Sequence, residues 1–329
     1  MIRERDLPSS KIGLVLGDPA GIGAELAARL LAGLGEDVLA QTTVIGDPRQ
    51  LAAGARVAGC RQAAVAVLDR ANADPEAIAL GRASAAGGRA ALDNLRCALE
   101  LAREARLDAI CFTPFNKQAL HLAGNRFEDE LRFAADFLGW RGPVGEFNVL
   151  ERLWNARVTS HVALREVAGL LSVPRILEAI VLTDAAMRAA DFARPRIAVA
   201  ALNPHAGEGG VFGSEEIEVI APAVDAARQQ GIDAAGPLPA DTVYLRASRG
   251  EFDAVVSMYH DQGQIAMKLL GFERGVTLLG GLPVPVTTPA HGTAYDIAGR
   301  GLARGGALEQ AFALARRMAG ARRPPPGSL

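Results

Sequence analysis

Short apolar runs alternate with longer amphipathic segments along most of this chain. The runs at 12–16, 42–45 and 196–202 are aliphatic and β-branched, and they have the length of buried strands. The segments at 87–105 and 174–192 repeat apolar residues every three or four positions, as amphipathic helices do. This alternation predicts βαβ units, a mostly parallel sheet and therefore an α/β fold.

The same patterns predict several further elements. Strands are expected at 63–68, 107–112 and 253–258, with a strand end at 158–160. Helices are expected at 24–32, 165–170 and 214–230, the last with Ser214 as its N-cap.

Length and charge narrow the class of protein. The 329 residues predict two domains. Lys and Arg number 35 and Asp and Glu 37, so the formal net charge is −2, which argues against a nucleic-acid partner. Because no Gly/Ser-rich linker separates two halves, we expect interleaved domains, formed by 1–130 with 281–329 and by 131–280.

The chain carries no pattern of a membrane or secreted protein. Neither an apolar leader nor an apolar run of membrane-spanning length is present, which favours a cytoplasmic protein without a membrane partner. Cys60, Cys97 and Cys111 lie in apolar surroundings without C-x-x-C spacing and are expected to be reduced core residues. The ending at 322–329 is typical of a disordered tail.

Three of the five histidines follow directly on predicted strands: His161, His205 and His260. Ligands of α/β proteins bind beyond the carboxyl ends of strands, and imidazole is the commonest metal ligand. Three such ligands with an open position are typical of a catalytic metal site. The alternative is that each histidine is a strand-end residue with local hydrogen bonds, and spacing alone does not decide between them.

Three charged residues near these histidines are candidates for proton transfer. Lys268 is either a desolvated proton donor or a surface lysine. Asp241 is either a helix cap or a carboxylate of the same site, and Asp261 is placed to orient its neighbour His260.

Two glycine-rich segments bear on cofactor binding. The turn at 17–25 has the spacing G-x-x-x-G-x-G and not the dinucleotide fingerprint G-x-G-x-x-G, and Asp47 is the one candidate for a ribose ligand. A Rossmann site is therefore not expected, and a structural turn or cleft wall is favoured. The loop at 280–299 is equally compatible with an adenosine-binding loop and with an ordinary crossover.

Six motifs together resemble one known family, that of 4-hydroxythreonine-4-phosphate dehydrogenase (PdxA). They are GDPAGIGAE, TPFNK, NPHAGEGGVFG, GPLPADTVY, YHDQGQIAMK and HGTAYDIAG, and the resemblance runs from about residue 12 to residue 302. It implies an isocitrate/isopropylmalate-dehydrogenase-like fold, with two α/β/α domains around a cleft, and a homodimer that shares its active site.

The resemblance also implies site residues and chemistry. A divalent metal (Zn, or Mg, Mn or Co) would be held by His161, His205 and His260, the last from the partner subunit. Catalytic roles fall on Lys268, Asp241 and Asp261, and the NAD or NADP loop lies around Gly292 and Asp296. The family reaction oxidises a secondary alcohol β to a carboxylate, and CO2 is then lost.

Departures from the family pattern concern the substrate. The region at 124–130 carries Glu128 and Asp129 where members have His and Thr, and Thr277 stands in place of an Asn. Val286 or its neighbours replace an Arg, and Ala290 replaces an Asp. Because phosphate needs cationic and amide donors, we expect a non-phosphorylated carboxylate substrate, such as a cis-dihydrodiol of the terephthalate type.

The sequence is also compatible with four other functions. They are the 4-hydroxythreonine-4-phosphate activity itself, a four-carbon sugar-acid phosphate dehydrogenase, a metal-dependent hydrolase or aldolase, and a non-catalytic metabolite-binding protein. Intact His, Asp and Lys positions favour an enzyme.

Overall fold

The computed structural model describes residues 12–74, 78–151 and 153–321. Their Cα positions divide into two compact units, one formed by the described parts of 1–141 and 282–329 and the other by 142–281. The chain thus leaves the first unit and returns to it. The expectations for the leader region and for the tail at 322–329 fall outside the described residues.

The first unit contains a parallel sheet with the strand order β3-β2-β1-β4-β11. Its strands are β1 (Ile12–Val15), β2 (Thr42–Gly46), β3 (Ala66–Asp69), β4 (Ala109–Phe112) and β11 (Val286–Pro289). The central strands β1, β2 and β4 are buried at every position, which agrees with the apolar sequences of β1 and β4, whereas β2 begins with two buried threonines.

Helices of the first unit begin where the sequence offers a cap. Helix α3 (Pro48–Ala58) starts after Asp47, whose side chain accepts a hydrogen bond from the Arg49 N–H. Helix α4 (Ala85–Arg103) starts after Ser84 in the same way. The remaining helices are α1 (Gly23–Gly33), α2 (Glu36–Ala40), α5 (Lys117–Leu122), α6 (Glu130–Phe137), the short η6 (Tyr295–Ile297) and α12 (Gly306–Ala321).

The second unit contains a mixed sheet with the strand order β10-β5-β6-β9-β7-β8. Its strands are β5 (Gly145–Leu150), β6 (Leu153–Arg157), β7 (Arg196–Ala200), β8 (Asp233–Leu238), β9 (Ala254–Ser257) and β10 (Val276–Gly280). Strand β5 runs antiparallel to both β10 and β6, whereas β6, β9, β7 and β8 are mutually parallel. The antiparallel hairpin was not expected from the sequence.

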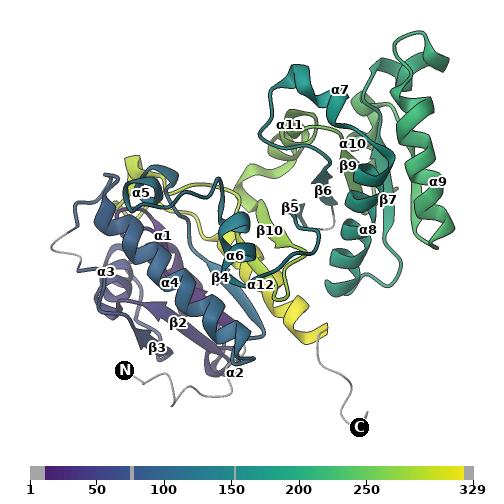
Figure 1. The fold of residues 1–329 in the computed structure, drawn as a ribbon. Helices are drawn as coiled ribbons and strands as arrows, with labels where there is room; N and C mark the ends of the chain where they lie inside the picture. Colours follow the sequence, from purple (N-terminus) through teal and green to yellow (C-terminus); the bar gives the residue numbers. More distant parts are fainter. Residues whose placement is uncertain (1–11, 75–77, 152, 322–329) are drawn as a thin grey trace, which may run out of the picture. The chain divides into compact units, whose positions relative to one another are not determined.

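Two pairs of helices cover the opposite faces of this sheet (Figure 1). Helices α10 (Ala240–Ser248) and α11 (His260–Gly271) share a core cluster with Ala198, Ala200 and Val255. Side chains alternate along a strand, so the intervening residues face the other pair, α8 (Val173–Ala189) and α9 (Ala221–Gln229). Trp154 lies on that second face, with its ring 6.2 Å from that of Phe192, just after α8.

Short elements show where the sequence-based boundaries were wrong. Residues 158–160 lie beyond β6, which ends at Arg157. The segment 165–170 forms a 3-10 turn, η2 (Leu164–Glu166), followed by a single helical turn, α7 (Val167–Leu170). The helix expected from 214 begins at Glu215 and continues as the π-helical turn η4 (Glu216–Ile220). The Ser214 carbonyl accepts from the N–H groups of Ile217 and Glu218, which agrees with its expected place as the N-cap residue. Two further 3-10 segments are η3 (Pro204–Gly210) and η5 (Phe272–Arg274).

The α/β class is confirmed, and Cys97 and Cys111 are buried free thiols, whereas Cys60 is half-buried. Burial raises the pKa of the Cys111 thiol to about 12. A search of the described helices found none with the length and apolarity needed to span a membrane.

The contact between α1 and α3 gives a stability test. A Cβ on Gly54 would lie 2.2 Å from the Ala24 carbonyl oxygen, whereas a Cβ on Gly33 would have no atom within 4 Å. We expect Gly54→Ala to lower the free energy of unfolding by about 1–3 kcal/mol because backbone must move. Gly33→Ala should be neutral or stabilising by up to about 1 kcal/mol. Equal urea midpoints for the two variants would contradict this account of the helix contact.

Candidate functional site

The three predicted metal ligands follow three strands that are neighbours in the sheet. His161 comes after β6, His260 after β9 and His205 after β7, and the strand order is β6-β9-β7. These strands are parallel, so their carboxyl ends lie at one edge of the sheet (Figure 1). The tertiary structure therefore places at one edge three histidines that are far apart in the sequence.

Two side chains join the ends of these strands. The Thr159 hydroxyl donates to the Met258 carbonyl at 2.7 Å, which ties the end of β6 to that of β9. The Gln262 amide nitrogen donates to the Ala201 carbonyl and its oxygen accepts from the Met258 N–H, both at 2.7 Å. The start of α11 is thus fixed to the ends of β7 and β9, and with it the position of His260.

His161 and His260 of one chain are neighbours. Their ring centres are 5.8 Å apart. Two imidazoles bound to one ion at metal–nitrogen distances of about 2.0–2.1 Å have ring centres roughly 4.5–5.5 Å apart, so these two rings lie just beyond the spacing of a shared ion. The Asp261 carboxylate lies 2.7 Å from the His260 Nδ1, as the sequence suggested. A carboxylate on one ring nitrogen leaves the other available to a metal.

His205 lies in an unusual backbone segment. Residues 205–209 all have positive φ, between 45° and 79°, and three of them are not glycine. Left-handed conformation costs a non-glycine residue roughly 1–2 kcal/mol, and such conformations often mark functional sites. Its Nδ1 lies 3.4 Å from Glu208 Oε2, and its ring centre is 6.3 Å from that of Phe212. Among the residues with assigned positions, no three His, Cys, Asp or Glu side chains form one metal-binding group.

The charged candidates beside the histidines are on the surface of the chain. Lys268, in α11, is exposed. Within one chain it is therefore a surface lysine and not a desolvated proton donor. Asp241, in the first turn of α10, is also exposed. Their catalytic roles stay predictions.

A buried polar group behind His161 was missed by the sequence analysis. Arg157, with a side chain 3% exposed, forms an ion pair with Glu146 at 2.7 Å and donates to Asn148 and to the Ser160 hydroxyl. It thereby holds the residue that precedes His161. The sequence did contain a signal for this group, namely the charged and amide residues within the mainly apolar strands β5 and β6. Because a buried charge requires partners, such residues indicate a buried polar network.

The same face carries a second buried group. The Tyr244 hydroxyl donates to Asn155 Oδ1 at 2.6 Å, and Ser257 also contacts this oxygen. A Cβ on Gly263 would lie 2.3 Å from Asn155, so only glycine allows α11 to approach this closely. Burial raises the pKa of Tyr244, and this hydroxyl is therefore a hydrogen-bond donor at neutral pH.

In the first unit, the glycine-rich turn after β1 packs tightly on the predicted cofactor loop. A Cβ on Gly21 would lie 2.8 Å from Thr293, and the Ile22 N–H donates to the Thr293 carbonyl at 3.1 Å. The Tyr295 hydroxyl donates to Asp18 at 2.6 Å. Gly292 and Asp296 themselves are exposed, which leaves this loop open to a ligand.

Asp18 is a buried carboxylic acid that accepts few hydrogen bonds. Its side chain accepts from the Ala20 N–H at 2.9 Å and from Tyr295. Burial raises the pKa of Asp18 above its ordinary 3.8, and the hydrogen bonds from Tyr295 and Ala20 only partly oppose this. The pKa of Tyr295 is raised by burial and by its contact with Asp18.

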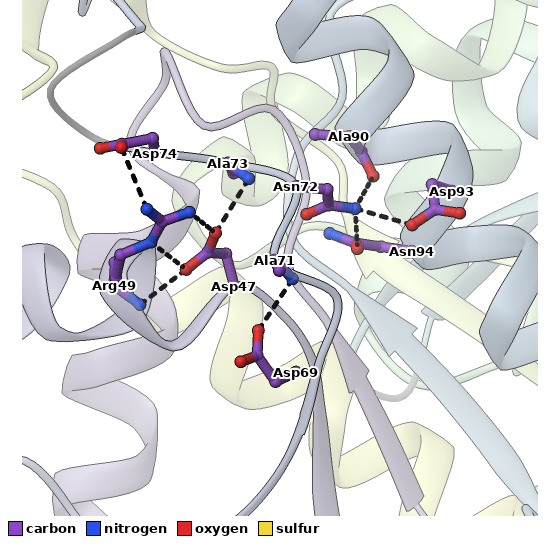
Figure 2. A network of polar contacts seen from close by, with 10 residues as sticks. All are labelled: Asp47, Arg49, Asp69, Ala71, Asn72, Ala73, Asp74, Ala90, Asp93 and Asn94. Atoms are coloured by element: carbon purple, nitrogen blue, oxygen red, sulfur yellow. Dashed lines mark hydrogen bonds and ion pairs between the residues drawn. The ribbon is translucent and has the colours of Figure 1, made fainter. Parts of the chain in front are cut away.

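Asp47 has a structural role and not that of a ribose ligand. Its carboxylate accepts from the Arg49 side chain and from the N–H groups of Arg49 and Ala73, as Figure 2 shows. Burial opposes ionisation, yet these hydrogen bonds lower its pKa. The oxygens are thus committed to the fold, which agrees with the absence of the dinucleotide fingerprint.

The three predicted substrate residues do not share one environment. Glu128 is exposed and lines a hollow of about 380 Å³ with Lys117, His121 and Arg126. Asp129 also borders this hollow, but its Oδ1 caps α6 by accepting from the Arg132 N–H at 2.7 Å. Thr277 lies in β10 of the second unit, opposite Asn148. Their substrate roles stay predictions.

Comparison with known proteins identifies the family. The family model of the pyridoxal phosphate biosynthetic protein PdxA matches residues 36–315. A Pseudomonas aeruginosa protein provisionally named 4-hydroxythreonine-4-phosphate dehydrogenase 2 is 54% identical over 94% of this chain and 96% of its own. The D-threonate 4-phosphate dehydrogenase of Salmonella typhimurium is 38% identical over 95% of this chain and 100% of its own. The chain therefore belongs to the PdxA family and is a dehydrogenase.

Solved structures agree with this assignment. The 4-hydroxythreonine-4-phosphate dehydrogenase of Klebsiella pneumoniae has a TM-score of 0.80 at 36% identity, covering 94% of this chain and 99% of that one. A terephthalate 1,2-cis-dihydrodiol dehydrogenase from Burkholderia xenovorans has a TM-score of 0.66 at 29% identity, with 94% and 98% covered. A β-decarboxylating dehydrogenase from Thermococcus kodakarensis shares the fold, with a TM-score of 0.51 at 14% identity over 94% of this chain and 84% of that one. The expected family and fold class are confirmed.

The opposite pKa shifts of Asp18 and Asp47 predict opposite effects on stability. Because the folded pKa of Asp18 is raised, the wild type loses stability as pH rises from 3.8 through that pKa. We expect Asp18→Asn to raise the thermal midpoint by a few degrees at neutral pH and to have no such effect well below pH 3.8.

Asp47→Asn is the matched control, with the same change in charge. The lowered pKa of Asp47 gives stability above pH 3.8 that is lost as pH falls through the folded pKa. This variant should therefore lower the midpoint at neutral pH, and the loss should shrink in acid. Calorimetric scans between about pH 3 and pH 8 measure both effects, and shifts of the same sign would contradict the assignment.

Proposed function

We propose that this chain is a metal-dependent, NAD(P)-linked dehydrogenase that oxidises a secondary alcohol β to a carboxylate, with loss of CO2. The observation that carries the proposal is the position of His161, His205 and His260 after three adjacent parallel strands, at one edge of the sheet. Membership of a dehydrogenase family supports the redox half of the reaction.

The proposed reaction balances as two steps. The carbinol carbon gives a hydride to NAD(P)+ while its hydroxyl proton goes to a base, which leaves a ketone β to the carboxylate. The bond to the carboxylate then breaks, CO2 leaves, and the electron pair forms an enolate that takes a proton on carbon. A divalent cation, when bound, supplies Lewis-acid stabilisation of negative charge on oxygen.

The residues of the chain have distinct proposed roles in these steps. His161, His205 and His260 would bind the cation, and Asp261 holds the His260 ring through its Nδ1. Asp241 and Lys268 are assigned to proton transfer, and Asp261 would also take part in it. The loop around Gly292 and Asp296, held by the Asp18–Tyr295 hydrogen bond, would bind the nicotinamide cofactor.

We further propose a homodimer in which the partner's copy of residue 260 completes the cation site. Within one chain the ring centres of His161 and His260 are 5.8 Å apart, so a site that uses the chain's own residue 260 is the alternative that the subunit-mixing experiment below tests. Large apolar side chains are exposed after each of the three histidines: Leu164 is 70% exposed, Val211 72% and Leu269 84%. A second copy of this chain, seated on these residues, would cover them and bring exposed Lys268 into a desolvated setting.

For the substrate, a phosphorylated four-carbon hydroxy acid is favoured. The support is that relatives 38–54% identical have names that include a 4-phosphate substrate. The hollow in the first unit does not discriminate between the candidates, because it is lined by Lys117, His121 and Arg126 and equally by the carboxylates of Glu128, Asp129 and Glu130. A cis-dihydrodiol carboxylate is the second candidate. It is supported by Glu128 and Thr277, which differ from the phosphate-binding pattern, and by the likeness to the terephthalate enzyme.

The cation site gives a test that needs no substrate. We expect the variants H161A, H205A and H260A each to weaken Co²⁺ binding by at least about 100-fold, because each loses an imidazole ligand. Isothermal titration of the metal-free protein measures this, and His121→Ala serves as a control because His121 lies in the other unit. Unchanged affinity in all three variants would refute the site.

A mixture of H161A and H260A subunits tests whether the site is shared. If residue 260 comes from the partner, half of the randomly reassociated dimers are mixed and one of their two sites is intact. The mixture should then regain about one quarter of the wild-type Co²⁺ sites. If residue 260 serves its own chain, no mixed dimer has an intact site, and the absence of recovery would contradict the shared arrangement.

A substrate panel distinguishes the two candidate substrates. NAD+ and NADP+ reduction would be followed with 4-hydroxythreonine 4-phosphate, D-threonate 4-phosphate and the cis-dihydrodiol of terephthalate, each with Zn²⁺, Mg²⁺, Mn²⁺ and Co²⁺. We expect turnover and CO2 release with a phosphorylated acid, and a loss of at least about 100-fold in kcat/KM without the phosphate. Turnover of the dihydrodiol alone would favour the second candidate, and no hydride transfer at all would refute the dehydrogenase function.

A further inference from the structure

The loop that carries His205 encloses a buried carboxylate that belongs to neither the histidines nor the proton-transfer residues. Glu216, at the start of η4, is only 2% exposed. Its Oε1 accepts hydrogen bonds from the N–H groups of Leu202 at 2.8 Å and Asn203 at 2.7 Å. Its Oε2 accepts from the Asn203 side-chain amide at 3.0 Å. One side chain thus binds two of the three residues that connect β7 to η3.

A second part of the loop, at Gly207, also packs against the Glu216 carboxylate. A Cβ on Gly207 would lie 2.7 Å from Glu216 Oε2, so the backbone two residues after His205 packs too closely on the carboxylate for any side chain there. Gly207 has a φ of 79° and sits within the left-handed run of 205–209. Because the run is intrinsically unfavourable for His205, Ala206 and Glu208, contacts outside it must hold it in place.

A second carboxylate, that of Glu215, also accepts a hydrogen bond from the Asn203 side chain. Glu215 Oε2 accepts from the Asn203 side-chain amide at 2.7 Å, and a Cβ on Gly213 would lie 2.5 Å from the same Glu215 oxygen. Glu215 is only half-buried, whereas Glu216 is buried and also binds the backbone. The backbone of the loop is therefore fixed mainly by Glu216.

We propose that Glu216 is a positioning residue for the cation site, which acts through the backbone at 202–203 and 207 to present the imidazole of His205. This inference rests on the proposed function, since it assumes that His205 is a metal ligand. Groups that orient a ligand typically change metal affinity by about 10–100-fold when they are removed. Glu216 differs from such groups in that it fixes the ligand's backbone and not its ring.

Three substitutions separate this role from a general role in folding. Glu216→Ala removes both acceptor oxygens. Glu216→Gln keeps one oxygen, which can still accept from the two backbone N–H groups. It loses the acceptor of the 3.0 Å bond from the Asn203 amide, and that amide keeps its bond to Glu215. Glu218→Gln is the matched control, because Glu218 is an exposed glutamate of the same short element.

The readouts are Co²⁺ affinity by isothermal titration and hydrogen exchange of the metal-free full-length protein. We expect Glu216→Ala to weaken Co²⁺ binding by about 10–100-fold and to speed exchange in the peptide that covers 202–213. Glu216→Gln should recover most of the affinity and the protection, and Glu218→Gln should match the wild type in both. Should the alanine variant not fold, the glutamine variant still tests the idea, with an expected loss of about 2–10-fold against Glu218→Gln.

The outcomes distinguish this inference from the proposed function. If His205→Ala leaves Co²⁺ affinity unchanged, the cation site itself is refuted. If His205→Ala weakens binding but both Glu216 variants bind Co²⁺ as the wild type does, only the positioning role is overturned. Faster exchange with unchanged affinity would likewise overturn it, because Glu216 would then serve the stability of the loop alone.

Discussion

The candidate site depends on the parallel alignment of β6, β9 and β7. Parallel strands bring their carboxyl ends to one edge, and the residues that follow them are therefore neighbours however far apart they are in the sequence. Thr159 and Gln262 then tie the three ends together through hydrogen bonds to backbone carbonyls and an N–H. The positions of His161, His205 and His260 follow from this arrangement.

Near that edge, the second unit contains buried polar side chains that are paired with one another. The Arg157–Glu146 ion pair joins β6 to β5, and Tyr244 and Asn155 form a buried hydrogen bond beneath α11. Buried polar groups are costly unless they are paired, and here they are paired in ways that fix Ser160 and α11. Rigid support of this kind keeps ligands in place before a metal or substrate binds.

The first unit uses close backbone contact for a similar purpose. Gly21 lets the turn after β1 lie against Thr293, and Tyr295 reaches the buried carboxylate of Asp18. The predicted cofactor loop is thus held from behind while Gly292 and Asp296 remain exposed.

The sequence by itself determined the α/β class, most strand and helix positions, the family and the three histidines, because hydrophobic periodicity and long motifs are local properties. It did not indicate the β5–β6 hairpin, and it placed the end of β6 too far along the chain. Only the tertiary structure decided that His161 and His260 are neighbours, that Lys268 is exposed in one chain, that Asp129 caps a helix and that Glu216 is enclosed by the His205 loop. Each of these features depends on contacts between segments that are distant in the sequence, and such contacts cannot be inferred from the spacing of residues along the chain.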